Sequence, residues 1–182
     1  WGVRFDGGAA NCCTQAEQAG LRCLWQRGSW RLLEQLNRPA ILTLTDANGR
    51  SHQAVLHAID GDRAKLSFST DTFKVSVSDI EDLWFGRYML IWRPPVDASG
   101  SITPGSRGPA VAWLRSSLQQ LAGETPQEGS DADFFDQSLE SRVREFQRQH
   151  RLQVDGMAGE QTQIVINSGL SSESVPRLSG ES

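Results

Sequence analysis

The sequence contains no long apolar run, no initiating methionine and little excess charge of either sign. Its longest apolar stretch, Met89 to Trp92, is far shorter than the ~18 residues that cross a bilayer, and we expect no signal peptide in these residues. The 18 basic and 22 acidic side chains leave a formal charge of −4. This balance excludes a general nucleic-acid binder, because such proteins carry a basic stripe. Since the chain starts at Trp1, we expect it to be a piece of a longer protein.

The composition is that of a globular protein, but it differs between the two parts of the chain. Of the 182 residues, 38% are hydrophobic and 22% are charged. Residues 1–95 hold 11 basic and 10 acidic side chains (+1), whereas residues 96–182 hold 7 and 12 (−5). Five of the six tryptophans and all three cysteines lie in the first part. The sequence therefore predicts two domains, with a boundary near Pro95.

The three cysteines, Cys12, Cys13 and Cys23, do not fit a metal site. They lack Cys-x-x-Cys spacing, a fourth cysteine and a nearby histidine, and we expect no metal and no other cofactor. Residues 12–19 are predicted to form a helix that stops at Gly20 and is followed by a strand. A disulfide from Cys12 or Cys13 to Cys23 would join the two elements and would imply an oxidising compartment. The alternative is three buried thiols in a cytosolic protein.

The rest of the first part alternates short strands with short helices. Ser29 is a good N-cap for a helix over residues 30–36, and Ser78 with Glu81 resembles the capping box of a second one over residues 78–83. Residues that favour β-structure, alternation of apolar and polar residues in two of the segments, and Asp- and Gly-containing turns between segments predict the strands. These strands cover residues 40–45, 53–59, 64–68, 72–77 and 88–92. We predict a small antiparallel α+β domain over residues 1–95.

The second part is predicted to be helical. Residues 96–104 lack periodicity and resemble a linker, and residues 105–168 contain apolar residues at steps of three and four that indicate three helices. Gly156 and Gly159 lie in a glycine loop before the third helix, with Asp155 and Thr162 as candidate caps. The Ser-, Gly- and Glu-rich residues 169–182 are expected to form a disordered tail.

The spacing of residues in the second domain resembles the type 1 peptidoglycan-binding family. The motif residues are Gly108, Val111, Leu114, Leu118, Phe135, Asp136, Leu139, Val143, Phe146, Gln147, Asp155, Gly156, Gly159 and Thr162. Arg115 and Glu160 depart from the family pattern, which has Gln and Pro there. A glycan–peptide ligand needs amide and guanidinium donors and an aromatic face. The candidates are Arg115, Phe134, Arg142, Gln147, Gln149 and His150, and a solvated helix surface is the alternative for each.

The first domain resembles a C39-type peptidase that has lost its chemistry. An active member needs a Cys nucleophile, a His base and an Asp that orients the base. His52 matches the base position, but Ser69 lies near the Asp position. The segment that should carry the nucleophile would precede Trp1, and Cys12 and Cys13 align with a later helix. We therefore expect no enzyme, with His52 a vestigial structural or surface histidine. The alternative is a cysteine amidase or endopeptidase that acts on cell-wall peptides.

Both domains together resemble the periplasmic region of the general secretion pathway protein A family. The matching runs are Gly20 to Trp30, Leu36 to Ala40 and Leu83 to Gly86. The resemblance implies a periplasmic module of an inner-membrane protein, anchored by an upstream helix and preceded by an ATPase. It also implies a partner, general secretion pathway protein B, and a role in inserting the type II secretin through the cell wall.

A cluster of large side chains in the first domain is a candidate docking surface for that partner. It consists of Trp84, Phe85, Arg87 and Tyr88, and aromatic residues are enriched at interface cores. Packing of a small core is the alternative interpretation of the same residues. The leading hypothesis is a non-catalytic module that binds peptidoglycan and a protein partner and that could also form a homo-oligomer.

Overall fold

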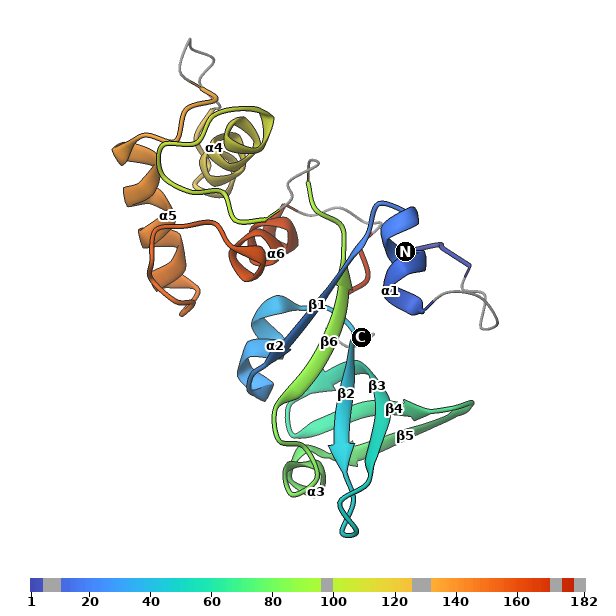
Figure 1. Cartoon of the computed structure of the whole chain (residues 1–182). Helices are drawn as coiled ribbons and strands as arrows, with labels where there is room; N and C mark the ends of the chain where they lie inside the picture. Colours follow the sequence, from blue (N-terminus) through green and yellow to red (C-terminus); the bar gives the residue numbers. More distant parts are fainter. Residues whose placement is uncertain (5–10, 96–99, 126–131, 171–174, 179–182) are drawn as a thin grey trace. The chain divides into compact units, whose positions relative to one another are not determined.

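The computed structural model describes residues 1–4, 11–95, 100–125, 132–170 and 175–178. The chain divides into two compact units (Figure 1). The first unit comprises Trp1–Arg93 together with Ser174–Ser182, and the second comprises Pro94–Glu173. Among the residues that the structure describes, none of the helices is both long enough and apolar enough to cross a membrane.

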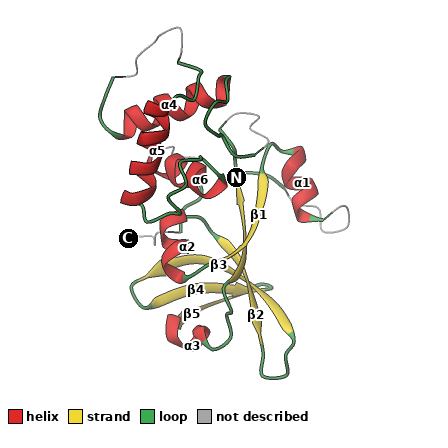
Figure 2. Cartoon of the chain, turned by 60° about the vertical axis from the view of Figure 1, so that its left-hand side comes forward, coloured by secondary structure: helices red, strands yellow, loops and turns green. Residues whose placement is uncertain are grey.

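The first unit is built on one six-stranded sheet, flanked by three short helices (Figure 2). The strands lie in the order β1-β6-β2-β3-β4-β5, and every neighbouring pair is antiparallel. This is the α+β fold with an antiparallel sheet that the sequence predicts. Its elements are α1 (Cys12–Gln18), β1 (Arg22–Arg27), α2 (Trp30–Leu36), β2 (Ala40–Thr45), β3 (Ser51–Asp60), β4 (Arg63–Phe68), β5 (Asp71–Ser76), α3 (Val77–Glu81) and β6 (Arg87–Trp92).

The register of the strands places a row of apolar side chains on one face of the sheet. Leu24, Leu90, Ala40, Leu56 and Leu66 face one another across five strands, and each is at most 3% exposed. Side chains alternate between the two faces of a strand. The neighbours of these residues therefore point to the opposite face. Helices α2 and α3 lie on one side of the sheet, and α1 lies on the other side beside β1 (Figure 2).

The ends of α2 confirm the predicted capping, but those of α3 do not. The Ser29 hydroxyl accepts a hydrogen bond from the Leu32 N–H (3.3 Å), as expected for an N-cap. In α3 the cap is Ser76, whose hydroxyl accepts from the Ser78 N–H (3.1 Å). The predicted capping box of Ser78 and Glu81 was wrong because β5 leads directly into the helix at Ser76, two residues earlier.

A disulfide joins α1 to β1. It connects Cys13 to Cys23, ten residues apart, and Cys12 is a half-buried free thiol. Of the two pairings that the sequence allows, the structure therefore contains the one through Cys13. The bond holds α1 against the sheet face opposite the row that contains Leu24.

The described residues of the second unit contain three helices, as predicted. They are α4 (Pro109–Leu121), α5 (Gln137–Gln149) and α6 (Glu160–Gly169). Asp136 caps α5 by accepting a hydrogen bond from the Leu139 N–H (2.7 Å). Phe135 is 1% exposed and directly precedes this cap. The buried helical residues include Val111, Leu114, Leu118, Leu139, Val143, Phe146, Ile164 and Ile166.

Part of the segment that we predicted as a linker belongs to the second unit. Ile102 is 5% exposed and exchanges two backbone hydrogen bonds with Ala158, of 3.1 and 2.9 Å. This bridge ties the approach to α4 to the glycine loop before α6. Of the predicted linker, residues 96–99 lie outside the described residues.

The predicted disordered tail contains an ordered contact with the first unit. Gly169 is still helical, and residues 171–174 and 179–182 lie outside the described part. Leu178 is 2% exposed, its N–H donates to Asn37 Oδ1 (2.9 Å), and its carbonyl accepts from the Ile59 N–H (3.2 Å). The polar composition of the tail as a whole did not predict this contact, because the contact depends on a single apolar side chain, that of Leu178, and on its two backbone hydrogen bonds.

Candidate functional site

Gln147 is buried in the second unit and holds the glycine loop. Its amide nitrogen donates to Asp155 Oδ1 (2.9 Å) and to the Met157 carbonyl (2.8 Å), and its oxygen accepts from the Gly156 N–H (3.0 Å). The Thr162 hydroxyl lies 3.3 Å from the same nitrogen. At 1% exposure, Gln147 serves the structure of this loop. We therefore do not count Gln147 among the residues that contact a ligand.

The glycine loop lies tightly against α5. A Cβ atom on Gly156 would come within 2.8 Å of Arg144 Nε and 2.9 Å of Glu140 Cγ, and the residue has a φ of +78°. Both constraints favour glycine. Arg144 also donates to Glu140 (2.9 Å) and to the Val154 carbonyl (3.2 Å). The loop conformation is thus set by contacts within the unit.

Arg115 links α4 to the start of α5. Its guanidinium donates to the carbonyls of Phe134 (2.7 Å) and Ala132 (3.3 Å), and it lies 3.2 Å from Asp136 Oδ2. The side chain is 15% exposed. The hydrogen bond from the Leu139 N–H, and then the Arg115 guanidinium, hold the pKa of Asp136 below its usual value. Arg115 therefore holds the residues before α5 in place, while a small part of its side chain stays exposed to solvent.

An aromatic ring and a second guanidinium lie side by side at this end of α5. The Arg107 guanidinium carbon is 4.3 Å from the centre of the Phe134 ring, within the range of cation–π contacts. Arg107 also pairs with Asp133 (3.3 Å) and is 56% exposed. Phe134 is half-buried. We did not predict Arg107 from the sequence, because its partners lie 26 and 27 residues away along the chain.

The other predicted ligand residues do not join Phe134 and Arg115. Arg142 pairs with Glu124 at the end of α4 (2.9 Å). Exposed Gln149 donates to Glu145 (3.0 Å), and exposed His150 lies with its ring 4.2 Å from that of Phe146. Partial burial of the His150 ring lowers its pKa. Because thirteen helical residues rise about 20 Å, Phe134 and His150 lie at opposite ends of α5.

The histidine that matches a catalytic base pairs with an aspartate that we did not predict. His52 Nε2 lies 3.0 Å from Asp46 Oδ2, and their side chains are 53% and 32% exposed. The hydrogen bond from His52 lowers the pKa of Asp46, with further help from the Arg50 N–H. The pair closes the turn between β2 and β3, which comprises residues 46–50, so its signal in the sequence is that of an ordinary turn.

No cysteine is placed to use this pair. His52 on β3 pairs in register with Leu44 on β2, and Cys23 on β1 pairs with Ile91 on β6. Since the register of β2 and β6 is also known, His52 and Cys23 are five residues apart along the strands and three strands apart across the sheet. With ~3.3 Å per residue and ~4.8 Å per strand, this separation is about 20 Å. Cys13 is consumed by the disulfide, and Cys12 lies next to it on α1. The described residues therefore contain no assembled Cys–His pair.

The predicted docking cluster divides into buried and exposed residues. Trp84 is 7% exposed, packs against Trp30 with ring centres 4.6 Å apart, and donates to the Arg87 carbonyl (2.8 Å). Tyr88 is 1% exposed, so these two rings belong to the core. Phe85 is 64% exposed, and Arg87 is exposed.

A third exposed side chain of the first unit, that of Trp25, was missing from the prediction. Trp25 is 57% exposed and faces Met89, and Arg87 lies two residues before Met89 on the same face of the sheet. We call Trp25, Phe85 and Arg87 the β1-edge surface. Its signal in the sequence was the density of tryptophans, which does not distinguish core from surface.

These features define a two-unit chain, with an α+β unit built on an antiparallel sheet and a helical unit. Residues 1–94 match the family described as "GspA, peptidase C39-like domain", and residues 107–166 match the one described as "Putative peptidoglycan binding domain". The chain belongs to the GspA C39-like family and represents its periplasmic region, with the peptidoglycan-binding domain after the C39-like one.

Two known proteins are similar over most of this chain. General secretion pathway protein A of Aeromonas hydrophila is 31% identical over 182 residues, 100% of this chain and 32% of that protein. The crystal structure of a periplasmic domain of the EpsAB fusion protein of the Vibrio vulnificus type II secretion system matches with a TM-score of 0.53 and 27% identity. It covers 86% of this chain and 68% of that one. The chain spans about a third of the length of its Aeromonas relative.

Proposed function

We propose that this chain is a non-catalytic periplasmic module that binds peptidoglycan through its second unit and a protein partner through its first. The observation that carries the proposal is the family match of both units in one chain. The lack of a Cys–His pair among the described residues supports the non-catalytic role. In the full-length protein the module would be anchored in the inner membrane and would help to insert the type II secretin through the wall.

The peptidoglycan-binding face that we propose lies at the start of α5. It combines the half-buried ring of Phe134 with the guanidinium groups of Arg107 and Arg115. An aromatic ring can stack on a sugar face, and guanidinium groups can donate to carboxylates and carbonyls of the stem peptide. Gln149 and His150, at the far end of α5, form the alternative face.

Sedimentation with purified sacculi tests this choice. We expect the unmodified chain to pellet with sacculi, and a variant with Arg107→Ala and Phe134→Ala to stay largely in the supernatant. The matched control changes Gln149→Ala and His150→Ala and should pellet normally. If the control loses binding and the first variant keeps it, the face lies at the other end of α5. Circular dichroism of both variants verifies that they are folded.

For the protein partner, we propose that the β1-edge surface contacts the periplasmic part of general secretion pathway protein B. Trp25, Phe85 and Arg87 are all exposed, and aromatic residues and Arg are enriched at the cores of protein interfaces. The EpsAB relative is a fusion protein of the type II secretion system, which supports an association of two such components.

A pull-down with that partner's periplasmic part tests the surface. A variant with Trp25→Ala and Phe85→Ala should retain less than about a tenth of the partner, since aromatic hot spots contribute about 2 kcal/mol or more. Phe73→Ala is the matched control, because Phe73 is also exposed (47%) but lies on β5 at the opposite edge of the sheet. Equal retention by both variants would place the interface elsewhere.

The enzyme hypothesis is tested separately by turnover. If the first unit were a cysteine amidase or endopeptidase, reduced protein would release muropeptides from sacculi, and Cys12→Ala or His52→Ala would abolish the release. We expect no release above buffer from the unmodified chain, with or without reductant, because Cys23, to which Cys13 is bonded, lies about 20 Å from His52.

A further inference from the structure

The sheet of the first unit has one face that helices cover and another that they largely leave open. Of the helices described in this unit, α2 and α3 lie on the face that carries Leu24 and Leu90 (Figure 2). On the opposite face, which we call the outer face, the disulfide between Cys13 and Cys23 holds α1 beside β1. The strand register identifies the other side chains of the outer face, because alternate residues of a strand point to the same side.

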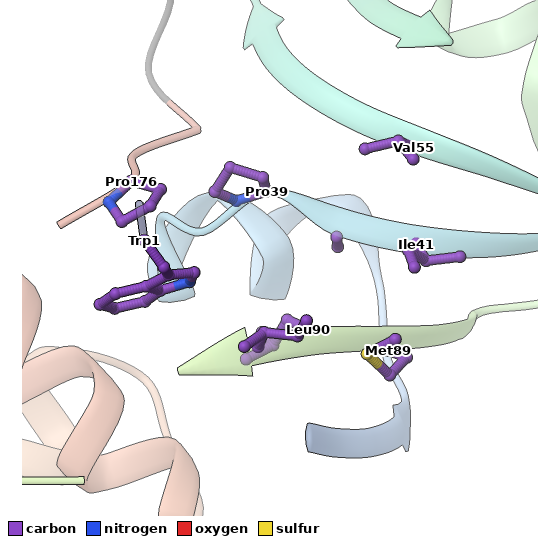
Figure 3. A pocket seen from close by; sticks show the side chains of 9 residues that line it. Trp1, Pro39, Ile41, Val55, Met89, Leu90 and Pro176 are labelled. Carbon is purple, nitrogen blue, oxygen red and sulfur yellow. The ribbon is translucent and has the colours of Figure 1, made fainter. Parts of the chain in front are cut away.

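An apolar row crosses the middle of the outer face. Trp25 on β1 pairs with Met89 on β6, Met89 pairs with Ile41 on β2, and Ile41 pairs with Val55 on β3. Trp25 is 57% exposed, whereas Ile41 and Val55 are half-buried and Met89 is 1% exposed. The last three line an apolar groove of about 210 Å³, so the row is recessed except at Trp25. The residues at the other end of this groove include Trp1, Pro39 and Pro176 (Figure 3).

At one corner of the outer face two arginines lie directly opposite each other. Arg27 on β1 pairs in register with Arg87 on β6, two residues along the strands from Trp25 and Met89. All four side chains therefore point to the outer face, and both arginines are exposed. Directly opposed residues have Cβ atoms about 5 Å apart, and like charges at such positions destabilise a sheet. The stability of the sheet therefore does not explain this pair.

The diagonally opposite corner carries two lysines. Lys65 on β4 pairs with Lys74 on β5. Ser67, two residues after Lys65, pairs with Val55 and so extends the line of the apolar row, and its hydroxyl oxygen lies 2.7 Å from His57 Nε2. The lysine pair is four strands and four residues away from the arginine pair. With ~4.8 Å per strand and ~3.3 Å per residue, the two pairs are about 23 Å apart.

No carboxylate of the sheet answers these four charges. Among the described strand residues of the outer face, Asp60 is the sole carboxylate, and it pairs in register with Arg63 at the end of the β3–β4 hairpin. Glu17 of α1 is further away, because α1 is bonded at Cys23, four residues from Arg27. The two arginines and two lysines make neither an ion pair nor a side-chain hydrogen bond within the part of the chain that the structure describes.

The geometry favours a segment of another protein as the occupant. A lipid bilayer is flat, so it would reach Trp25 but not the recessed Met89. The second unit of another copy is a poor complement, because many of its carboxylates already pair with its own arginines. These ion pairs are Asp133 with Arg107, Asp136 with Arg115, Glu124 with Arg142, Glu140 with Arg144, and Glu145 with Arg148.

We propose that the outer face binds an acidic amphipathic helix of another protein, with apolar side chains in its middle and carboxylates near both ends. A helix of about 15 residues spans 23 Å. Its apolar stripe packs on the row from Trp25 to Val55 and forms a helical layer on this face. Its carboxylates pair with the two basic corners. The inference rests on the proposed partner-binding role of the first unit, but not on the identity of that partner.

A peptide-binding measurement tests the face. Two fluorescent peptides of about 15 residues carry leucines at every third or fourth position, as an amphipathic helix does. One has two Glu at each end, and the other has Gln at the same places. We expect the full chain to bind the Glu peptide about tenfold more tightly at low ionic strength, since several exposed ion pairs each contribute a little. Equal affinities, or no saturable binding of the Glu peptide, would overturn the proposal.

Substitutions at the corners locate the effect. Lys65→Gln together with Lys74→Gln should reduce the preference for the Glu peptide to about threefold, and the same change at both arginines should do likewise. The matched control is Arg31→Gln with Arg50→Gln, which removes two exposed charges from α2 and from the β2–β3 turn. This control should keep the full preference. An equal reduction by the control would assign the preference to net charge and contradict the proposal.

Two further readouts separate this inference from the proposed function and from membrane binding. If the pull-down shows that Trp25→Ala with Phe85→Ala keeps the partner while the Glu peptide is still preferred, the β1-edge surface is wrong and the acidic-helix site stands. Loss of the partner without a preference for the Glu peptide gives the reverse result. Vesicles of phosphatidylglycerol should not bind, and vesicle binding that requires the two lysines, without peptide binding, would overturn the proposal.

A last measurement combines stability and binding in one variant. Lys74→Glu places a carboxylate opposite Lys65 and should raise the equilibrium constant for folding about threefold. The same variant should bind the Glu peptide more weakly than the unmodified chain does. In a Lys65→Gln background the gain in stability should vanish. A variant that is no more stable, or that binds the Glu peptide as tightly as before, would contradict the proposed role of this corner.

Discussion

The backbone N–H of Gly28 donates a hydrogen bond of 2.9 Å to the carbonyl of Gly86, and the two residues lie in direct contact. A Cβ atom on Gly86 would come within 2.6 Å of the Gly28 carbonyl oxygen, and the φ of Gly86 is +80°. This contact closes the first unit between the end of β1 and the start of β6. The adjacent Trp84 and Tyr88 can therefore be buried while Phe85 between them stays exposed.

Gly86→Ala should accordingly destabilise the chain more than a positive φ alone would. We expect a loss of about 2–4 kcal/mol in the free energy of unfolding, from steric overlap added to backbone strain. Gly49→Ala is the control, because Gly49 has a similar φ of +75° but open space around it. It should lose only about 1 kcal/mol. Urea denaturation of both variants measures the difference.

Replacing Gln147 with leucine should unfold the glycine loop of the second unit. The substitution leaves the Gly156 N–H and the Met157 carbonyl without their partner in a buried place. We expect a cost of about 2–4 kcal/mol, since each unsatisfied buried group costs about 1–3 kcal/mol. Gln149→Leu, two residues further on the exposed side, should change stability by less than about 0.5 kcal/mol. A similar loss for both variants in denaturation would show that Gln147 does not hold the loop.

The disulfide gives a prediction that separates the two adjacent cysteines. Cys13→Ser should lower the free energy of unfolding by about 2–3 kcal/mol, because a closed loop of this length restricts the unfolded chain. Cys12→Ser should have little effect. Adding reductant should destabilise the unmodified chain and the Cys12→Ser variant alike, and leave Cys13→Ser unchanged. If reductant destabilised Cys13→Ser as well, Cys12 would be able to replace Cys13 in the bond.

The lowered pKa of Asp136 predicts a dependence of stability on pH. A carboxyl whose pKa is lower in the folded state stabilises fully above its unfolded pKa of about 4, and this contribution is lost as the pH falls through the folded pKa. Asp136→Asn keeps an oxygen that can cap α5 but removes the charge. The variant should be about 0.5 kcal/mol less stable at pH 7. The difference should vanish near pH 2, and a constant difference at all pH values would assign it to the cap alone.

The elements of the fold could be predicted from local patterns because their causes are local. Ser29 lies at the position where its hydroxyl reaches the Leu32 N–H, and the alternation in β2 follows from one buried face. The predicted cap of α3 was wrong because Ser76 and Ser78, two residues apart, are both suitable N-caps. Only the end of β5 at Ser76 decides between them.

The site residues were harder to predict because exposure depends on contacts between distant segments. Gln147 and Gln149 are equivalent donors in the sequence, yet only the glycine loop, eight or more residues away, buries the first. Trp84 and Trp25 are likewise equivalent until the fold packs Trp84 against Trp30 and leaves Trp25 exposed. The pairing of Leu178 with Asn37 spans 141 residues and leaves no periodic signal.

The contact of Leu178 also sets an order of events in the folding of the protein. A chain that is delivered from its first residue onward generally folds domain by domain as the domains appear. The residues of the sheet and helices of the first unit are complete once residue 93 has been delivered, but Leu178 follows only after the whole second unit. During that interval the Ile59 N–H lacks the carbonyl of Leu178 as its acceptor on a unit whose sheet is otherwise complete.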